Sequence, residues 1–284
     1  MTISLQTTVT TKPSARPISH EDRVMLIGSC FSDEIGARMA QAGMQVLSNP
    51  MGTLYNPMSI AESLRRAIEG NGLESSEIFL HDGLWHSWLH HGSFSKIDRS
   101  ECLQLCNSRF DTTRQWLQAS PIVIITFGTA YVFYRKGKVV GNCHKMPAGD
   151  FERRRLTIEE IVQCYRPLLK HLTAIGARII FTVSPIRHMA DGAHGNQLSK
   201  SILLLAIDEM TRANEGVEYF PSYEIVTDEL RDYRFYADDM VHPTSLAVDI
   251  VWQRWQETYM TPATRQECLN RSKEYKRTQH RPLH

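Results

Sequence analysis

The sequence has no long hydrophobic run and no excess of charge of either sign. Its apolar stretches, such as residues 122–127, fall far short of the roughly 18 residues that a membrane-spanning helix needs, so no membrane span is expected. Lysine and arginine number 32 and aspartate and glutamate 31, which gives a formal net charge of +1 at pH 7. Because a nearly neutral chain does not attract polyanions, nucleic acid is not expected among its partners.

Cysteine is scarce and unpatterned. The six cysteines include no C-x-x-C pair and no zinc-ribbon spacing, so neither a disulfide scaffold nor a structural zinc is expected. His81, His86, His90 and His91 match no zinc-site spacing either. The N-terminal residues lack the basic start and apolar stretch of a secretory signal, which predicts a cytoplasmic location.

Buried-type strands alternate with helical periodicity along the 284 residues. Strands are predicted at 24–27, 122–127, 178–183 and 217–220, and the helices that alternate with and follow them include 57–68, 99–119, 157–176, 197–214 and 246–259. Hairpins are predicted at 78–94, around Asp82 and Gly83, and at 131–140. Thr157-Ile-Glu-Glu160 has the spacing of a capping box at the start of a helix. This alternation is typical of one α/β domain on a mainly parallel sheet. We expect a single domain over 1–284, with an irregular N-terminal arm of about residues 1–20 and a polar, aperiodic C-terminal tail of about 265–284.

Polar loops follow three of the predicted strands, at 28–29, 128–129 and 184–196. Ligands of open parallel sheets bind at the carboxyl ends of the strands, so the site is expected at this edge. Ser29 begins a helix there, where helical N–H groups favour negative charge on a bound oxyanion. It is either a nucleophile or a serine that only caps the helix.

Asp239 and His242 form an Asp-x-x-His motif before the last predicted helix. Such a carboxylate can orient an imidazole that activates a serine hydroxyl. The alternative is a loop aspartate and a histidine that form local hydrogen bonds only.

Several further blocks carry a family resemblance. They are Gly-Ser-Cys-Phe at 28–31, Ser-Asn-Pro-Met-Gly-Thr-Leu-Tyr-Asn-Pro at 48–57, Asn-Cys-His-Lys at 142–145, Ser-Pro-Ile-Arg-His at 184–188, His-Gly-Asn-Gln-Leu-Ser-Lys at 194–200, Tyr-Phe-Pro-Ser-Tyr-Glu at 219–224 and Asp-x-x-His-Pro at 239–243. With them the chain strongly resembles the GSCFA family from about Met25 to Trp255. The fifth residue of the name-giving run is Ser32 here rather than alanine.

The GSCFA family is in turn similar to SGNH or GDSL-like hydrolases, which are esterases with a three-layer α/β/α sandwich. The resemblance implies that Ser29 is the nucleophile, His242 the base and Asp239 the residue that orients it. It also implies that the N–H groups of Gly52 and Ser29 bind the oxyanion. No metal or organic cofactor is required by such a mechanism.

One oxyanion position departs from the hydrolase pattern. The third block of those enzymes is Gly-x-Asn-Asp, and Ala130 stands here in place of the asparagine. Loss of one such donor costs on the order of 100-fold to 1000-fold in rate. Thr129, Asn142 or Asn196 replaces the missing hydrogen bond, or the chain is a weak hydrolase or none.

The loop at 184–196 holds the densest group of polar residues at the expected site. We expect Arg187, His188, His194 and Asn196 to bind substrate there, or to satisfy one another within the loop. Trp85 and Trp88 are candidates for stacking on a sugar ring. Cys30 is expected to pack at the sheet–helix interface rather than to react.

The leading hypothesis is a serine-dependent ester hydrolase or acyltransferase, acting for example on an O-acylated carbohydrate or another small ester. The rival is a non-catalytic module that binds a glycan or a small anion on a degenerate hydrolase fold, and a phosphodiesterase-like activity is a weaker third hypothesis. The oligomeric state does not follow from the sequence.

Overall fold

The computed structural model describes residues 7–119 and 121–279. At its centre lies a five-stranded parallel sheet in the order β10-β9-β5-β1-β2. The strands are β1 (Arg23–Gly28), β2 (Gln45–Ser48), β5 (Ile122–Phe127), β9 (Arg178–Val183) and β10 (Val217–Phe220). The α/β fold with a mainly parallel sheet is therefore confirmed, and β2, a short strand with polar ends, is the one strand of this sheet without a sequence prediction.

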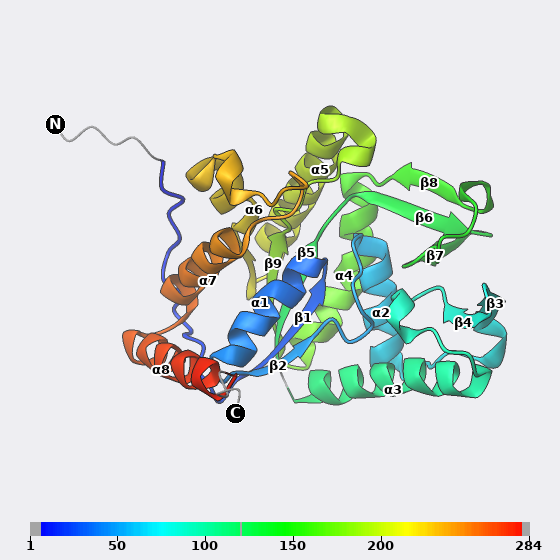
Figure 1. Cartoon of the computed structure of the whole chain (residues 1–284), viewed down its shortest axis with the longest axis horizontal. Helices are drawn as coiled ribbons and strands as arrows, with labels where there is room; N and C mark the ends of the chain where they lie inside the picture. The colour runs from blue at the N-terminus through cyan, green and yellow to red at the C-terminus, as the bar shows by residue number, and fades with distance from the viewer. Residues whose placement is uncertain (1–6, 120, 280–284) are drawn as a thin grey trace, which may run out of the picture.

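Helices cover both faces of this sheet (Figure 1). They are α1 (Cys30–Gln41), α2 (Pro57–Glu69), α3 (Arg99–Gln118), α4 (Ile158–Ala174), α5 (Gly192–Ala213), α6 (Ser222–Glu224), α7 (Ser245–Tyr259) and α8 (Pro262–Gln279). Successive side chains of β1 point to opposite faces. Val24 and Leu26 pack in the core with residues of α1 and α7, whereas Met25 and Ile27 pack with residues of α2, α3, α4 and α5. Three layers result, as expected.

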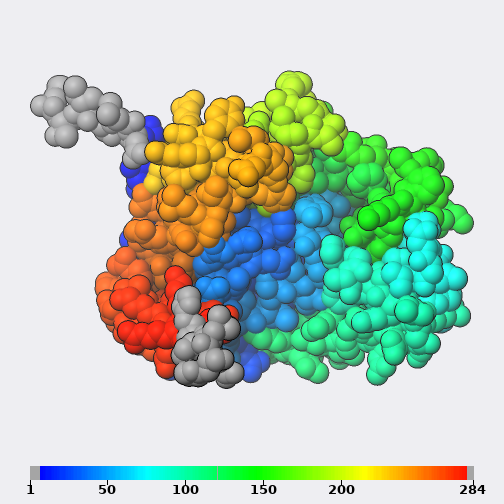
Figure 2. All heavy atoms as spheres, viewed as in Figure 1, coloured from blue at the N-terminus to red at the C-terminus, as the bar shows by residue number. Residues whose placement is uncertain are grey.

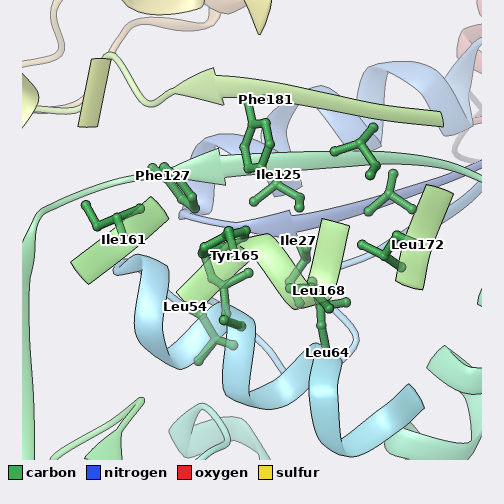
Figure 3. Packing of buried hydrophobic residues seen from close by; sticks show 14 of the residues in the cluster. Ile27, Leu54, Leu64, Ile125, Phe127, Ile161, Tyr165, Leu168, Leu172 and Phe181 are labelled. Atoms are coloured by element: carbon green, nitrogen blue, oxygen red, sulfur yellow. The ribbon is translucent and has the colours of Figure 1, made fainter. Parts of the chain in front are cut away.

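Three aromatic rings pack together in the core between the sheet and helices α2 to α5, part of which Figure 3 shows from close by. The rings of Phe127 and Phe181 lie 5.4 Å apart and that of Tyr165 meets Phe127 edge-on at 5.2 Å. The Tyr165 hydroxyl donates to the Pro57 carbonyl at 3.0 Å, so its polar atom is paired although it is fully buried. This core fixes the strands whose ends form the site.

Local signals define where the helices begin. Thr157 and Glu160 form the predicted capping box at the start of α4, in which each side chain accepts the other residue's backbone N–H. At α2, Asn56 caps the Ser59 N–H at 2.9 Å and Pro57 occupies the first turn. These ends match the sequence expectations.

Two small antiparallel sheets flank the central one. β3 (Ile78–His81) pairs with β4 (Leu84–Ser87), and β6 (Tyr131–Arg135) pairs with β7 (Lys138–Val140) and with β8 (Glu152–Arg155). Asp82 and Gly83 have φ values of 47° and 75°, as a two-residue hairpin turn of the primed type requires. Both predicted hairpins are present.

Short turns complete the chain. They are the 3₁₀ turns Ser75–Glu77, Gly92–Phe94, Ala148–Asp150, Met189–Asp191 and Tyr233–Phe235 and the π turn Ile225–Leu230.

The two ends of the chain differ from one another. Residues 7–20 form no helix or strand, but the N–H groups of Ser14 and Ile18 donate to carbonyls at the end of α7. The C-terminal segment is not aperiodic: α8 is helical to Gln279, and its Cys268 is buried. Its helix-forming residues are polar almost all round, so no hydrophobic period marked it. Residues 1–6 and 280–284 of the expected arm and tail lie outside the described residues.

The strand order places one position of the sheet at a change of direction. From β1 the chain moves outward to β2, and it then crosses back to β5 on the other side of β1 before continuing to β9 and β10. Such a switch point opens a crevice at the carboxyl ends of the two strands concerned. Here these ends are Gly28 of β1 and Phe127 of β5. Along the described residues, no helix is both long and apolar enough to span a membrane.

Phe181→Ala is expected to lower the free energy of unfolding by about 3–5 kcal/mol, because it opens a cavity between Phe127 and Tyr165. Urea denaturation measures the change. Leu205→Ala, on the exposed face of α5, is the control and should stay within about 0.5 kcal/mol of wild type. Equal effects of the two changes would contradict this assignment of the core.

Candidate active site

Ser29 stands between β1 and α1, at the change of direction in the sheet. Gly28 before it has a φ of 147°, and a Cβ at this position would lie 2.1 Å from the carbonyl oxygen of Thr126. Only glycine tolerates that backbone and that approach. The tight turn brings Ser29 against the end of β5, where a Cβ added to Gly128 would lie 3.4 Å from the Ser29 Cβ.

The Ser29 side chain is enclosed and caps α1. The residue is 1% exposed, and its hydroxyl oxygen accepts the Phe31 N–H at 3.3 Å. Its own N–H donates to the Thr126 carbonyl at 3.2 Å. The capping alternative is thus realised, and it leaves the hydroxyl proton free for another acceptor. No hydrogen bond between Ser29 and His242 occurs in the described part of the chain.

Asn49 holds the backbone on both sides of Ser29. Its Oδ1 accepts the Gly28 N–H at 2.8 Å, and its Nδ2 donates to the Ser29 carbonyl at 3.3 Å. The side chain is buried and the residue has a φ of 40°, which asparagine tolerates better than most residues. The sequence analysis did not single it out, although it lies in the recognised 48–57 block.

The loop that contains Gly52 lies over this turn. Its Tyr55 carbonyl accepts the N–H groups of Gly128 and Thr129, at 2.8 and 2.9 Å. Gly52 has a φ of 76°, and its N–H donates to the Asn49 carbonyl at 2.7 Å. The N–H expected to bind an oxyanion is therefore engaged within the loop.

The other candidate oxyanion donors are engaged as well. Thr129 bonds through its hydroxyl to Ser199 Oγ at 3.2 Å, and the N–H of the buried Ala130 donates to the same Ser199 oxygen at 2.7 Å. The Asn142 Oδ1 accepts the His144 N–H at 2.8 Å, in the loop after β7. The structure places Thr129 in the strand end that contacts Ser29, and it shows no contact of Asn142 with that end in the described residues.

Asp239 and His242 are paired. Asp239 Oδ2 lies 2.6 Å from His242 Nδ1, and Asp239 Oδ1 accepts the N–H groups of Val241 and His242 at 2.9 Å. These bonds, first the backbone and side-chain bonds from His242, lower the pKa of Asp239 to about 2. Both side chains are half exposed, so the far nitrogen of the imidazole is open to a partner. The carboxylate therefore fixes the orientation of the imidazole.

Arg187 connects this pair to the end of β9. Its N–H donates to the Val241 carbonyl at 3.2 Å and its guanidinium to the Met240 carbonyl at 3.1 Å. The guanidinium also lies 5.8 Å from the Tyr236 ring centroid. Arg187 was expected to bind substrate, and here it holds the loop that carries His242.

The predicted 184–196 loop is shorter than expected, because α5 begins at Gly192. His194 is exposed on the first turn of α5, whereas Asn196 is buried and its Oδ1 accepts the His188 N–H at 2.9 Å. Burial, with a smaller effect of Lys200, lowers the pKa of His188 to about 4. His188 is therefore neutral at pH 7, and its ring meets Tyr55 edge-on at 6.1 Å.

A bidentate ion pair holds the start of α5 and was missed. Arg153 on β8 donates to both carboxylate oxygens of Asp191, at 2.8 and 2.6 Å, and lies over the Tyr131 ring. Because these partners are 38 residues apart, no local pattern announced them.

One of the two tryptophans, Trp88, is not free to stack on a sugar. Trp88 lies parallel to Phe79 at 3.6 Å, and Arg135 covers its ring at 4.8 Å. Arg99 lies 4.8 Å from the Trp85 ring. The expected role is thus wrong for Trp88, because Phe79 and Arg135 occupy its faces.

Burial raises the pKa of the Cys30 thiol, which argues against a reactive thiolate.

A cavity of about 1120 Å³ lies away from these residues, between α2, α4 and the small sheets. Trp88 lines it, but none of the proposed catalytic, oxyanion or substrate-binding residues does.

At the surface, Figure 2 shows the N-terminal part of the chain (blue) recessed between the segment after 220 (orange) and the small sheets (cyan to green). The described residues include no group of three or more metal-ligating side chains.

His242→Ala is expected to raise the pKa of Asp239 from about 2 towards the ordinary 3.8, because the side-chain bond is lost. The backbone bonds from residues 241 and 242 remain, so the rise is incomplete. Because the pKa of Asp239 is lower in the folded than in the unfolded protein, the hydrogen bonds to its carboxylate stabilise the folded loop above about pH 4. This stabilisation is lost as pH falls towards 2. Carboxyl-carbon NMR titration measures the shift. His194→Ala is the control, and an unchanged Asp239 titration in His242→Ala would refute the pairing.

Comparison with known proteins gives a family. Solved structures with a similar fold include a family two carbohydrate esterase from Clostridium thermocellum, in complex with cellohexaose, at 13% identity and a TM-score of 0.40. The match covers 85% of this chain and 64% of that one. A carbohydrate esterase family 3 protein from Talaromyces cellulolyticus matches at 12% identity and a TM-score of 0.40, over 88% and 99% of the two chains. No curated protein matches. The GSCFA family model matches residues 23–255, and the chain belongs to the GSCFA family.

Proposed function

We propose that this protein is a serine-dependent ester hydrolase or acyltransferase. The observation that carries the proposal is the 2.6 Å contact between Asp239 and His242, in a loop that Arg187 ties to the sheet edge where Ser29 begins α1. A base held by a carboxylate, at the same edge as a serine on a tight turn, is the combination that acyl transfer needs.

In the proposed reaction, Ser29 Oγ attacks the acyl carbon while its proton passes to His242 Nε2. Asp239 accepts the Nδ1–H, which fixes the tautomer and stabilises the imidazolium. The alkoxide then leaves with the proton from His242, and an acyl ester remains on Ser29. Water then attacks the acyl carbon and passes a proton to His242; the bond to Ser29 breaks, Ser29 takes that proton from His242, and the acid is released. An alcohol in the place of water gives an ester and thus acyl transfer. The reaction consumes no cofactor.

The enclosure of Ser29 requires a movement before attack. Gly128 lies against it and is held there by the Tyr55 carbonyl, and no hydrogen bond joins it to His242 in the described residues. We propose that substrate binding displaces the loop at 49–56. This displacement also frees the Gly52 N–H for the oxyanion, with Thr129 and Asn142 as further candidate donors.

The proposed substrate is a small ester, for example of an O-acylated carbohydrate. His194 is exposed on the first turn of α5, and Arg187 and His188 lie in the adjoining loop. Such side chains bind hydroxyl and carboxylate groups. Asn196 acts through His188, since its amide holds that backbone.

A non-catalytic binding module remains the second candidate. It is favoured by the enclosed Ser29 and by the prior engagement of the Ser29 and Gly52 N–H groups. In this case Arg187, His188 and His194 would bind a glycan or a small anion, and Ser29 would serve only as a helix cap.

Treatment with a fluorophosphonate and mass spectrometry of the peptides distinguishes the two candidates. Wild type is expected to be labelled at Ser29 and Ser29→Ala not at all. His242→Ala should be labelled at least about 100-fold more slowly, in line with the contribution of a general base. Ser63→Ala is a matched control. Like Ser29, Ser63 is buried, and its hydroxyl has no hydrogen-bond partner among the described residues.

Folded wild type that is not labelled, or label that persists in Ser29→Ala, would contradict the catalytic proposal. Thermal-shift screening with acetylated and plain oligosaccharides and with small anions would then test the binding module.

A further inference from the structure

Lys200, on α5, is a buried lysine that the proposed mechanism does not use. It is 1% exposed, and its ammonium donates to the Gly128 and Ser184 carbonyls, each at 2.7 Å. The described residues contain no ion pair of Lys200, and its neighbours include the Tyr223 ring, at 5.7 Å. Burial of a cation without a carboxylate is costly, so a structural crosslink alone is a poor explanation for it.

The two carbonyls belong to the strand ends that surround Ser29. Gly128 follows β5 and contacts the Ser29 side chain, and Ser184 follows β9 and donates its N–H to the Phe127 carbonyl at 2.8 Å. The Lys200 ammonium therefore bridges β5 and β9 at the edge where the catalytic residues are proposed.

A chain of hydrogen bonds extends from Lys200 to the loop over Ser29. The Gly128 carbonyl shares its peptide unit with the Thr129 N–H, which donates to the Tyr55 carbonyl at 2.9 Å. A charged donor on the carbonyl polarises that peptide and strengthens the next bond. Positive charge also favours the oxyanion that forms at a neighbouring acyl carbon.

We propose that Lys200 is a positioning residue of the ester hydrolase site, and that its ammonium holds Gly128, Ser184 and the Tyr55 loop around Ser29 and favours the oxyanion formed there. This inference rests on the proposed function. The Lys200 ammonium supplies positive charge to a site in which Ala130 stands in place of the oxyanion asparagine of SGNH-like hydrolases.

The charge is sensitive to pH near neutrality. Burial lowers the pKa of Lys200 to about 7. The titratable groups that face it are His188 in the loop after β9, neutral above a pKa of about 4, and Tyr223 in α6, whose pKa burial raises. Asp191 and Arg153 act on His188 from the start of α5 and from β8. Neither neighbour of Lys200 changes charge near pH 7, so the change there belongs to Lys200 itself.

The rate of fluorophosphonate labelling, measured from about pH 5.5 to about pH 9.5 so that the titration of a lysine with a pKa of about 7 is covered on both sides, tests the proposal. Wild type should label fastest near neutrality and lose about 10-fold at the alkaline end, the difference between a charged and a neutral donor. Lys200→Met should be slower at low pH and lack the alkaline fall. Lys200→Gln retains a neutral donor without the charge and should also lack the fall. Lys170→Met, an exposed lysine on α4, is the matched control.

A folding readout accompanies the rates. Below its unfolded pKa, a lysine with a lowered folded pKa destabilises the protein, so wild-type stability should rise with pH from about 7 to 10. Lys200→Met should lose this rise in urea denaturation, and if it does not fold, Lys200→Gln is used for both measurements.

The outcomes separate this inference from the proposed function. Labelled wild type with variants of unchanged rate and pH profile overturns the role of Lys200 alone. Wild type that is not labelled at any pH overturns the proposed function and this inference with it.

Discussion

Buried backbone groups at the carboxyl ends of β1, β5 and β9 are the constraint on which this site depends. Each strand leaves the sheet at that edge with N–H and carbonyl groups that no further strand can pair, and leaving one unsatisfied costs about 1–3 kcal/mol. Side chains from distant segments form hydrogen bonds with these groups. Asn49 accepts the Gly28 N–H and donates to the Ser29 carbonyl, and Lys200 donates to the carbonyls of Gly128 and Ser184. The edge is therefore built around its polar groups.

The same demand competes with the proposed catalysis. The N–H groups that would bind an oxyanion, those of Ser29 and Gly52, already donate to Thr126 and Asn49. An N–H that donates to a carbonyl can exchange it for a more negative acceptor, since bonds to charged groups are the stronger ones. In the proposed reaction, loop stability and oxyanion binding would thus draw on the same donors, and the free energy of this exchange would contribute to the barrier.

The sequence predicted the parts of this structure whose causes are local. The strands at 122–127 and 178–183 are short runs made mostly of apolar residues, and the capping box at Thr157 lies within four residues. β2 is four residues with a polar residue at each end, and α8 is polar almost all round, so neither carries a period. Asn49 and Lys200 could not be assigned roles, because their partners lie 16 to 72 residues away. Trp88 was misjudged for the same reason, since Arg135 and Phe79 cover it only in the folded chain.

The two halves of the proposed active site differ in their exposure to solvent. Asp239 and His242 are half exposed and already hydrogen-bonded, whereas Ser29 is enclosed. The segment after β9 contacts both halves: its Ser184 carbonyl is held by Lys200 beside the serine, and its Arg187 holds the histidine loop. In the proposed mechanism this segment connects the two halves, so the movement that uncovers Ser29 is expected to shift the loop that carries His242 as well.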